Sequence, residues 1–152
     1  ALVSAIANGG TLYYLQHPRT LQETATFQPM IKRELDISAI TPDLLEGLSG
    51  AVEFGTARTV RYNFIEEPVL GKTGTCSQDG TRYGWFASYA NTQYGRIVTV
   101  VMLRGGWPTY GPKAAEIAGR MYRNLYDNSF FAGGATTTTD AAPAAKTVGA
   151  SQ

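Results

Sequence analysis

Three strand-like segments separated by two short turns constrain the fold more than any other feature of the sequence. They run over residues 69–77, 82–90 and 96–104. Asp79-Gly80 between the first two is a typical tight-turn pair, and the polar segment 91–95 separates the second from the third. Connections this short join antiparallel neighbours, because parallel strands need a crossover of about a dozen residues or more. The sequence therefore predicts an antiparallel three-stranded meander.

The third of these segments is the most apolar part of the chain. From Ile97 to Leu103 only Thr99 is polar. A strand that is apolar on both sides is typical of a sheet covered on both faces, so we expect both faces of this strand to be covered. An uncovered edge on such a strand invites aggregation, and we therefore expect upstream residues to pair with it.

Helices are expected before and after the strands. One covers residues 1–8 and ends at Gly9-Gly10, and an extended segment over 11–16 follows it. A second begins with Thr41 as the cap and Pro42 at the first helical position, and ends at Gly55. The last runs from Pro112 to about Asp127 and would lie across the sheet. Its apolar positions recur at helical spacing: Ala114, Ile117, Ala118, Met121 and Leu125.

These elements predict an α+β domain over residues 1–131, built from an antiparallel sheet flanked by helices. After Phe131 the composition changes to Ala, Gly, Thr and Pro, so residues 132–152 are expected to form a disordered tail.

The composition excludes several classes of function. Thirteen basic and twelve acidic residues give a net charge of +1, which argues against nucleic acid as a partner. Cys76 is the one cysteine and His17 the one histidine, so neither an internal disulfide nor a zinc site is expected. No cofactor is indicated. No apolar run reaches the ~18 residues that span a bilayer.

The segment Gly71-Lys72-Thr73-Gly74-Thr75 on the first strand carries the candidate chemistry. Alternation along a strand places Thr73 and Thr75 on one face and Lys72 on the other. The two hydroxyls can hold a carboxylate, and the lysine supplies positive charge nearby. Gly74 lets a ligand backbone approach closely, and the strand's free N–H and C=O groups can pair with an extended peptide.

Gly-Lys-Thr also ends the phosphate-binding P-loop, but that motif requires a glycine where this chain has Glu66. A P-loop is therefore excluded.

Four segments in order resemble the transpeptidase domain of penicillin-binding proteins over roughly residues 1–127. Lys72–Thr75 is similar to the family's third motif, and Gly84-Trp85-Phe86-Ala87 to its next strand. The stretch 5–13 resembles the Ala-Asn-Gly-Gly segment upstream, and 45–57 resembles the helix and Gly-Thr-Ala turn between the two. The resemblance implies the C-terminal part of a serine D,D-transpeptidase or β-lactamase-like fold, incomplete, with three strands and their packing helices.

The resemblance also implies an activity and its residues. The family acylates a serine with the D-Ala-D-Ala end of a peptidoglycan stem peptide, and β-lactams acylate the same serine. Carried over by position, Lys72, Thr73, Gly74 and Thr75 would bind the terminal carboxylate of either ligand. Lys72 and Thr75 are the candidate catalytic residues, and the backbone N–H of Thr75 would be one of two oxyanion donors.

The family's nucleophile motif, Ser-x-x-Lys, is absent from this chain, and so is the second motif, Ser-x-Asn. Tyr89-Ala90-Asn91 imitates a variant of the second motif but follows Lys72 instead of preceding it. We therefore expect a fragment of a longer bacterial parent, inactive and poorly stable alone, whose N-terminal part is missing. The parent would be anchored by an absent upstream membrane segment, on the periplasmic or extracellular face of the cytoplasmic membrane.

Two other functions stay open. The first is a β-lactamase or β-lactam sensor with the same fold, and the second is a non-catalytic binding remnant that keeps only the carboxylate clamp. Single residues also have ordinary interpretations: Trp85 and Phe86 as core, Cys76 as a small, partly buried residue, and Arg104 as either a cleft residue or a solvated strand end.

Overall fold

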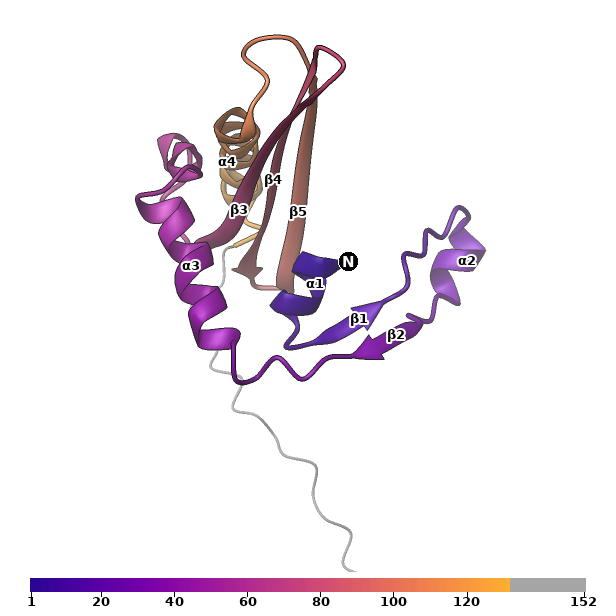
Figure 1. Ribbon diagram of the computed structural model, residues 1–152. Coiled ribbons are helices and arrows are strands. Elements are labelled where there is room, and N and C mark those ends of the chain that lie inside the picture. The colour runs from indigo at the N-terminus through magenta and orange to yellow at the C-terminus, as the bar shows by residue number, and fades with distance from the viewer. Residues whose placement is uncertain (132–152) are drawn as a thin grey trace, which may run out of the picture.

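A three-stranded antiparallel sheet forms the centre of the molecule (Figure 1). The computed structural model describes residues 1–131, so the disordered tail expected over 132–152 lies outside the described part of the chain. The strands are β3 (Val69–Gln78), β4 (Thr81–Thr92) and β5 (Gly95–Gly105), in the spatial order β3-β4-β5. Both pairings are antiparallel, which confirms the predicted meander.

Helices cover one face of the sheet and flank one of its edges. Helix α4 (Gly111–Asp127) lies across the sheet, as the sequence predicts, and contacts all three strands. Helix α3 (Thr41–Glu53) lies beside β3, and the 3-10 helix η1 (Arg58–Tyr62) packs against α3 and α4. The short α1 (Leu2–Ala7) contacts β4 and β5, where Arg96 donates to the carbonyl of Ala7.

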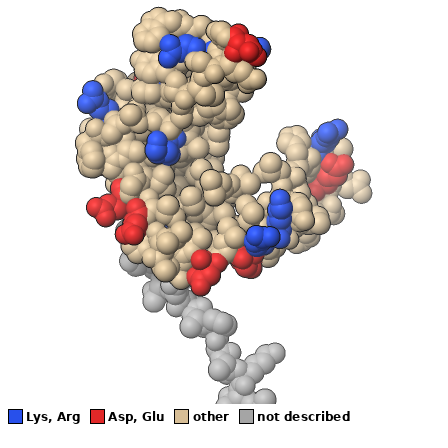
Figure 2. Space-filling model, viewed as in Figure 1, with Lys and Arg blue, Asp and Glu red and all other residues tan. Residues whose placement is uncertain are grey.

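An arm extends from the body of the molecule. Strand β1 (Thr11–Tyr13) pairs with β2 (Ile31–Glu34), and helix α2 (Leu21–Ala25) lies at the far end (Figure 1). Figure 2 shows a hollow between this arm and the body. The extended segment expected over 11–16 is confirmed at its start, but β2 was not foreseen because all four of its residues are exposed and show no apolar alternation.

The core lies between α4 and the sheet. Ala114, Ala115, Ala118 and Tyr122 are completely buried there, and so is Phe86 of β4. Gly119 lets α4 approach η1 closely, since a Cβ at this position would overlap the Val60 carbonyl oxygen and lie 3.0 Å from its Cα. Small side chains therefore set the distance between α4 and its neighbours.

One polar pair is buried in this core. The hydroxyls of Ser88 and Tyr122 lie 3.0 Å apart, and each satisfies the other. The Tyr122 ring stacks on Phe64, with the ring centroids 5.8 Å apart. Burial raises the pKa of the Tyr122 hydroxyl above its ordinary value of 10.0, and the bond to Ser88 offsets part of that rise.

The opposite face of the sheet is largely uncovered by the described residues. Val98, Val100 and Met102 of β5 are 37%, 57% and 49% exposed, and Trp85 of β4 is 41% exposed. The expectation that both faces of β5 are covered is therefore wrong for residues 1–131, where α1 reaches only one end of this face. The interpretation of Trp85 as a core residue is also wrong, whereas Phe86 on the other face is buried as expected.

The predicted cap of α3 is wrong by one residue. Thr41 is the first residue of the helix, and Ile40 precedes it without any side-chain cap. The Thr41 hydroxyl donates backwards to the carbonyl of Ile37, 2.7 Å away, because a preceding turn continues into the helix. Cys76 is exposed, so its expected partial burial is wrong too. No described helix has the length and apolar character needed to cross a membrane.

Replacing two helical glycines by alanine should change stability in opposite directions. Gly119→Ala should lower the free energy of unfolding by about 1–3 kcal/mol, because the new methyl group collides with the Val60 backbone. Gly47→Ala should raise it by about 0.5–1 kcal/mol, because a Cβ there meets nothing within 4 Å and alanine favours the helix. Urea denaturation measures both changes. A change of the same sign in the two variants would contradict the close approach of α4 to η1.

The raised pKa of Tyr122 predicts a loss of stability in alkali. The unfolded chain releases this proton near pH ~10 while the folded chain keeps it, so the contribution is complete below about pH 10 and is lost at higher pH. Tyr122→Phe should flatten the fall of the urea midpoint between about pH 9 and about pH 11. Tyr94→Phe is the matched control, because Tyr94 is 73% exposed, and its curve should follow the unsubstituted chain.

Candidate functional site

The Lys72–Thr75 segment lies on β3, at the edge of the sheet. Thr73 pairs with Phe86 on the face that α4 covers, and Lys72 pairs with Ala87 on the open face. Thr73 and Thr75 therefore point together and Lys72 points away from them, in agreement with strand alternation. Within residues 1–131, β3 has a strand partner only on its β4 side, and its other edge, which α3 flanks, has no strand paired with it.

The start of α4 docks directly on this segment. The backbone N–H of Gly111 donates to the Thr75 hydroxyl oxygen at 2.8 Å. Only glycine fits at this position, since a Cβ on Gly111 would lie 2.8 Å from the Cβ of Thr73 and 3.0 Å from the carbonyl oxygen of Gly74. The preceding residue, Tyr110, lies equally close, because a Cβ on Gly84 of β4 would lie 2.5 Å from its carbonyl carbon.

A second segment reaches Thr73 from the other side. The hydroxyls of Thr56 and Thr73 lie 2.5 Å apart. Thr56 belongs to the Gly55-Thr56-Ala57 turn that follows α3, where Ala57 is completely buried and its N–H donates to Ala51. The turn and the strand, which the sequence analysis singled out separately, are therefore in direct contact.

Lys72 is exposed and carries a charge that no described carboxylate neutralises. Its ammonium group donates to the carbonyl oxygen of Thr73 at 3.0 Å, and it forms no ion pair with residues 1–131. The positive charge stays beside the backbone of Thr73 and is free to attract an anion.

The described residues around position 74 leave room for a side chain, so their packing does not require a glycine there. A Cβ at this position would meet only the Trp85 side chain, at 3.6 Å or more. This room lies on the open face of the sheet, where a ligand can approach the strand backbone.

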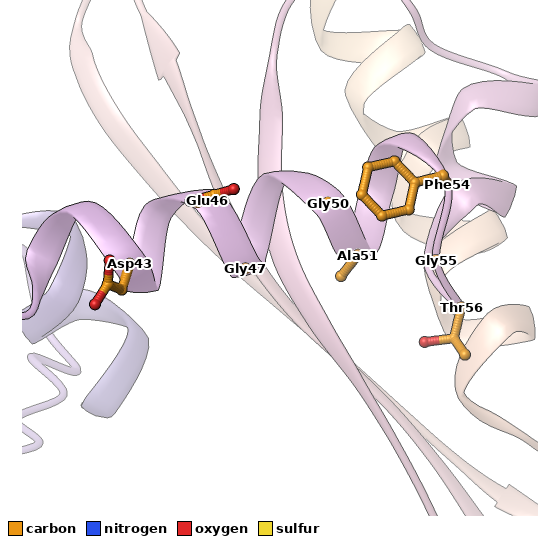
Figure 3. A pocket seen from close by; sticks show the side chains of 8 residues that line it. All are labelled: Asp43, Glu46, Gly47, Gly50, Ala51, Phe54, Gly55 and Thr56. Atoms are coloured by element: carbon orange, nitrogen blue, oxygen red, sulfur yellow. The ribbon is translucent and has the colours of Figure 1, made fainter.

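A shallow pocket of about 600 Å³ lies on the outer side of α3 (Figure 3). Phe54 covers Gly50 at one end, next to Thr56, and the carboxylates of Asp43 and Glu46 lie toward the other end. Figure 2 shows acidic side chains gathered over the lower part of α3. These charges repel an anion, so a carboxylate ligand is favoured at the threonines and not in this pocket.

The structure adds two residues to those predicted from the sequence. Thr56 and Gly111 each hold one hydroxyl of the motif, and neither had a role assigned to it. Gly111 carries a weak signal, since it precedes Pro112 at the start of a helix. Arg104 lies on the same face as Lys72 but is paired with Tyr83 and exposed. No group of three metal-ligating side chains occurs within the described residues.

Comparison with known proteins identifies what the chain resembles. The family model for the penicillin-binding protein transpeptidase domain matches residues 1–126. The D,D-transpeptidase domain of a peptidoglycan glycosyltransferase from Eggerthella lenta is similar in structure, with a TM-score of 0.57 and 18% identity over 84% of this chain. The transpeptidase domain of the FtsI4 D,D-transpeptidase from Legionella pneumophila has a TM-score of 0.53 and 19% identity over 83% of this chain.

These similarities cover only part of the other proteins. The chain spans 31% of the first structure and 42% of the second. No curated protein matches the chain significantly. At these identities the two structures establish the fold, an α+β arrangement shared with transpeptidase domains, as the sequence predicts.

Removing the Thr75 hydroxyl should loosen the start of α4. Thr75→Val leaves the Gly111 N–H without its acceptor, so hydrogen exchange at this amide should accelerate about tenfold. Thr75→Ser keeps the oxygen and should preserve the slow exchange. Equal exchange rates in the two variants would show that the Gly111–Thr75 bond does not hold the helix start in place.

Proposed function

Because the chain belongs to the penicillin-binding protein transpeptidase domain family, we propose that it carries the carboxylate-binding half of a D,D-transpeptidase site. Domains of this family act on peptidoglycan in the cell envelope. The substrate proposed here is the D-Ala-D-Ala end of a stem peptide, and β-lactams would occupy the same place. The finer location, the periplasmic or extracellular face of the cytoplasmic membrane, is part of the proposal.

The hydrogen bond from Gly111 to Thr75 is the observation that carries this proposal. A hydroxyl has two lone pairs and one hydrogen. Since Thr75 accepts from Gly111 through one lone pair, its own O–H remains available to donate to a carboxylate. The short Thr56–Thr73 contact likewise uses one of the two hydroxyl hydrogens and leaves the other available. Thr75 is therefore held by the Gly111 backbone with its own O–H free, and Thr73 is held by the Thr56 side chain with one hydroxyl hydrogen of that pair free.

The remaining residues of the motif complete the proposed clamp. Lys72 supplies an unneutralised positive charge at the backbone of Thr73, and charge-assisted hydrogen bonds to a carboxylate are about twice as strong as neutral ones. Gly74 leaves room for the ligand backbone beside the strand edge. The backbone N–H of Thr75 is proposed as one of two oxyanion donors, a group whose loss typically costs ~100- to 1000-fold in rate.

Acyl transfer needs more than this sequence contains. No serine in the chain is followed three residues later by lysine, so the family's nucleophile motif is absent. The nucleophile and the general base are therefore assigned to other parts of a longer parent, of which residues 1–131 would form the C-terminal part of the transpeptidase domain. The domain division proposed from the sequence, with residues 132–152 as a separate tail, belongs to the same proposal.

The clamp predicts binding that depends on a free C-terminal carboxylate. An N-acetylated tripeptide ending in D-Ala-D-Ala should shift the amide resonances of Thr73, Gly74 and Thr75, and Thr75→Val should weaken binding about tenfold. Ser77→Ala is the matched control, because Ser77 lies on the same face of β3 two residues further on. The same peptide with an amidated C-terminus should bind at least about tenfold more weakly; equal binding of the two peptides would refute the clamp.

The absent nucleophile predicts that the chain forms no acyl-enzyme. Incubation with a fluorescent penicillin should leave no label on the chain after denaturing electrophoresis. The same penicillin, added at high concentration, should still shift the amide resonances of the Thr73–Thr75 segment. A labelled band would place a reactive nucleophile within these 152 residues.

A further inference from the structure

An arginine and two aromatic side chains form a cluster near the tip of the β3–β4 hairpin. The Arg82 guanidinium carbon lies 5.2 Å from the centre of the Trp107 ring. Trp107 and Tyr110 stack nearly parallel, with their ring centres 5.8 Å apart and an angle of 8° between them. Trp107 is nevertheless 77% exposed, so most of the indole surface is available to a ligand. We call these three residues the arginine–aromatic cluster.

Arg82 lacks the partners that an arginine normally has. Its Nε atom is buried and forms no hydrogen bond with the described residues. Residues 1–131 provide no carboxylate within ion-pair distance of its guanidinium group. A planar fork of five N–H donors suits a carboxylate, which it can bind through two parallel hydrogen bonds. Because no described carboxylate pairs with this guanidinium group, its charge is left for an anionic ligand to neutralise.

The cluster is connected to the proposed carboxylate clamp through the backbone. Tyr110 directly precedes Gly111, whose N–H donates to the Thr75 hydroxyl. The Tyr110 backbone also lies against Gly84, the residue opposite Thr75 on β4. The backbone of the residue that carries one of the stacked rings is therefore fixed next to the clamp.

Strand register brings a bound peptide from the clamp to this cluster. If a peptide adds to the free edge of β3 in antiparallel orientation with its last residue opposite Thr75, earlier residues extend toward Gln78. The residue two positions before the last then lies opposite Ser77 and points to the same face. Ser77 is paired with Arg82, so that face is the one that carries the guanidinium group.

The distance also fits. Neighbouring strands lie about 4.8 Å apart, so the added strand and β4 are separated by about 10 Å. An arginine and a side chain of glutamate length together span this separation. Trp107 is 77% exposed and lies against Arg82, so its indole offers an apolar surface to the aliphatic part of a side chain that reaches this arginine.

We propose that the arginine–aromatic cluster is a second anion-binding subsite, which selects peptides carrying a carboxylate side group two positions before the C-terminal residue. Arg82 binds the carboxylate, and Trp107 and Tyr110 form the wall that supports its stem. This subsite rests on the proposed function, since the clamp at Thr73 and Thr75 sets the position of the peptide.

The test compares two N-acetylated peptides, Glu-D-Ala-D-Ala and Gln-D-Ala-D-Ala, which differ in one charge. Nuclear magnetic resonance titration of the full chain follows the indole N–H signals of both tryptophans, assigned with Trp107→Phe. Trp85 is paired with Gly74 on the opposite face of the sheet, so its indole signal reports binding at the clamp and should respond in the same way to both peptides. The glutamate peptide should bind about five- to tenfold more tightly than the glutamine peptide, and at equal occupancy it should shift the Trp107 indole signal further.

Two variants that each lose one positive charge test whether the preference for glutamate depends on Arg82. Arg82→Gln should abolish the preference for glutamate and leave the Thr73–Thr75 amide shifts in place. Arg104→Gln removes the same charge from the neighbouring strand on the other face of the sheet, where Arg104 pairs with Tyr83, and should retain the preference. Loss of the preference in both variants would mean that general charge attraction acts here, and would overturn the subsite.

A further probe separates this proposal from the clamp. The glutamate peptide with an amidated C-terminus retains only the side-chain carboxylate and should still shift the Trp107 indole, weakly, at high concentration. Equal affinity for the glutamate and glutamine peptides, with the carboxylate clamp intact, would overturn the subsite alone. Equal binding of free and amidated peptides would refute the clamp, and an unshifted Trp107 signal with the amidated glutamate peptide would refute the subsite.

Discussion

One hydrogen bond, from the Gly111 N–H to the Thr75 hydroxyl, joins the covering helix to the edge strand that carries the motif. The helix start can come this close because position 111 has no side chain. The same contact leaves the hydroxyl hydrogen of Thr75 unused. Helix packing and the ability of the strand to bind an anion therefore depend on the same pair of residues, and the covering helix cannot shift without altering the site.

The sequence predicts the parts of this fold that are governed by local patterns. The three strands and α4 have strong alternation or helical spacing, tight turns and a helix-starting proline, so their order and direction follow from the chain itself. Strand β2 and helix α2 escape prediction because they are short and exposed, and they bury no apolar face that would produce a periodic pattern. The predicted cap at Thr41 is wrong because its hydroxyl donates to the carbonyl of Ile37 in the preceding turn and does not accept from a helical N–H.

In the candidate site too, local sequence patterns predict some features and not others. Lys72 and the two threonines could be placed on opposite faces from strand geometry alone. Thr56 and Gly111 could not be assigned, because 17 and 36 residues separate them from their hydroxyl partners and only the folded sheet brings them together. Whether Trp85 and the apolar face of β5 are exposed depends on what covers the sheet. The sequence pattern of one strand does not specify that covering.

The close approach of Tyr110 to Gly84 has a consequence for how the sequence can vary. A side chain at position 84 would collide with the Tyr110 backbone, displacing the loop that leads into Gly111. Selection on the motif therefore extends to a residue on the neighbouring strand that touches no ligand. Among relatives that retain this loop, position 84 should stay glycine even where the sequence of the surrounding strand varies. A screen for loss-of-function substitutions would therefore detect position 84 as readily as a residue of the motif itself.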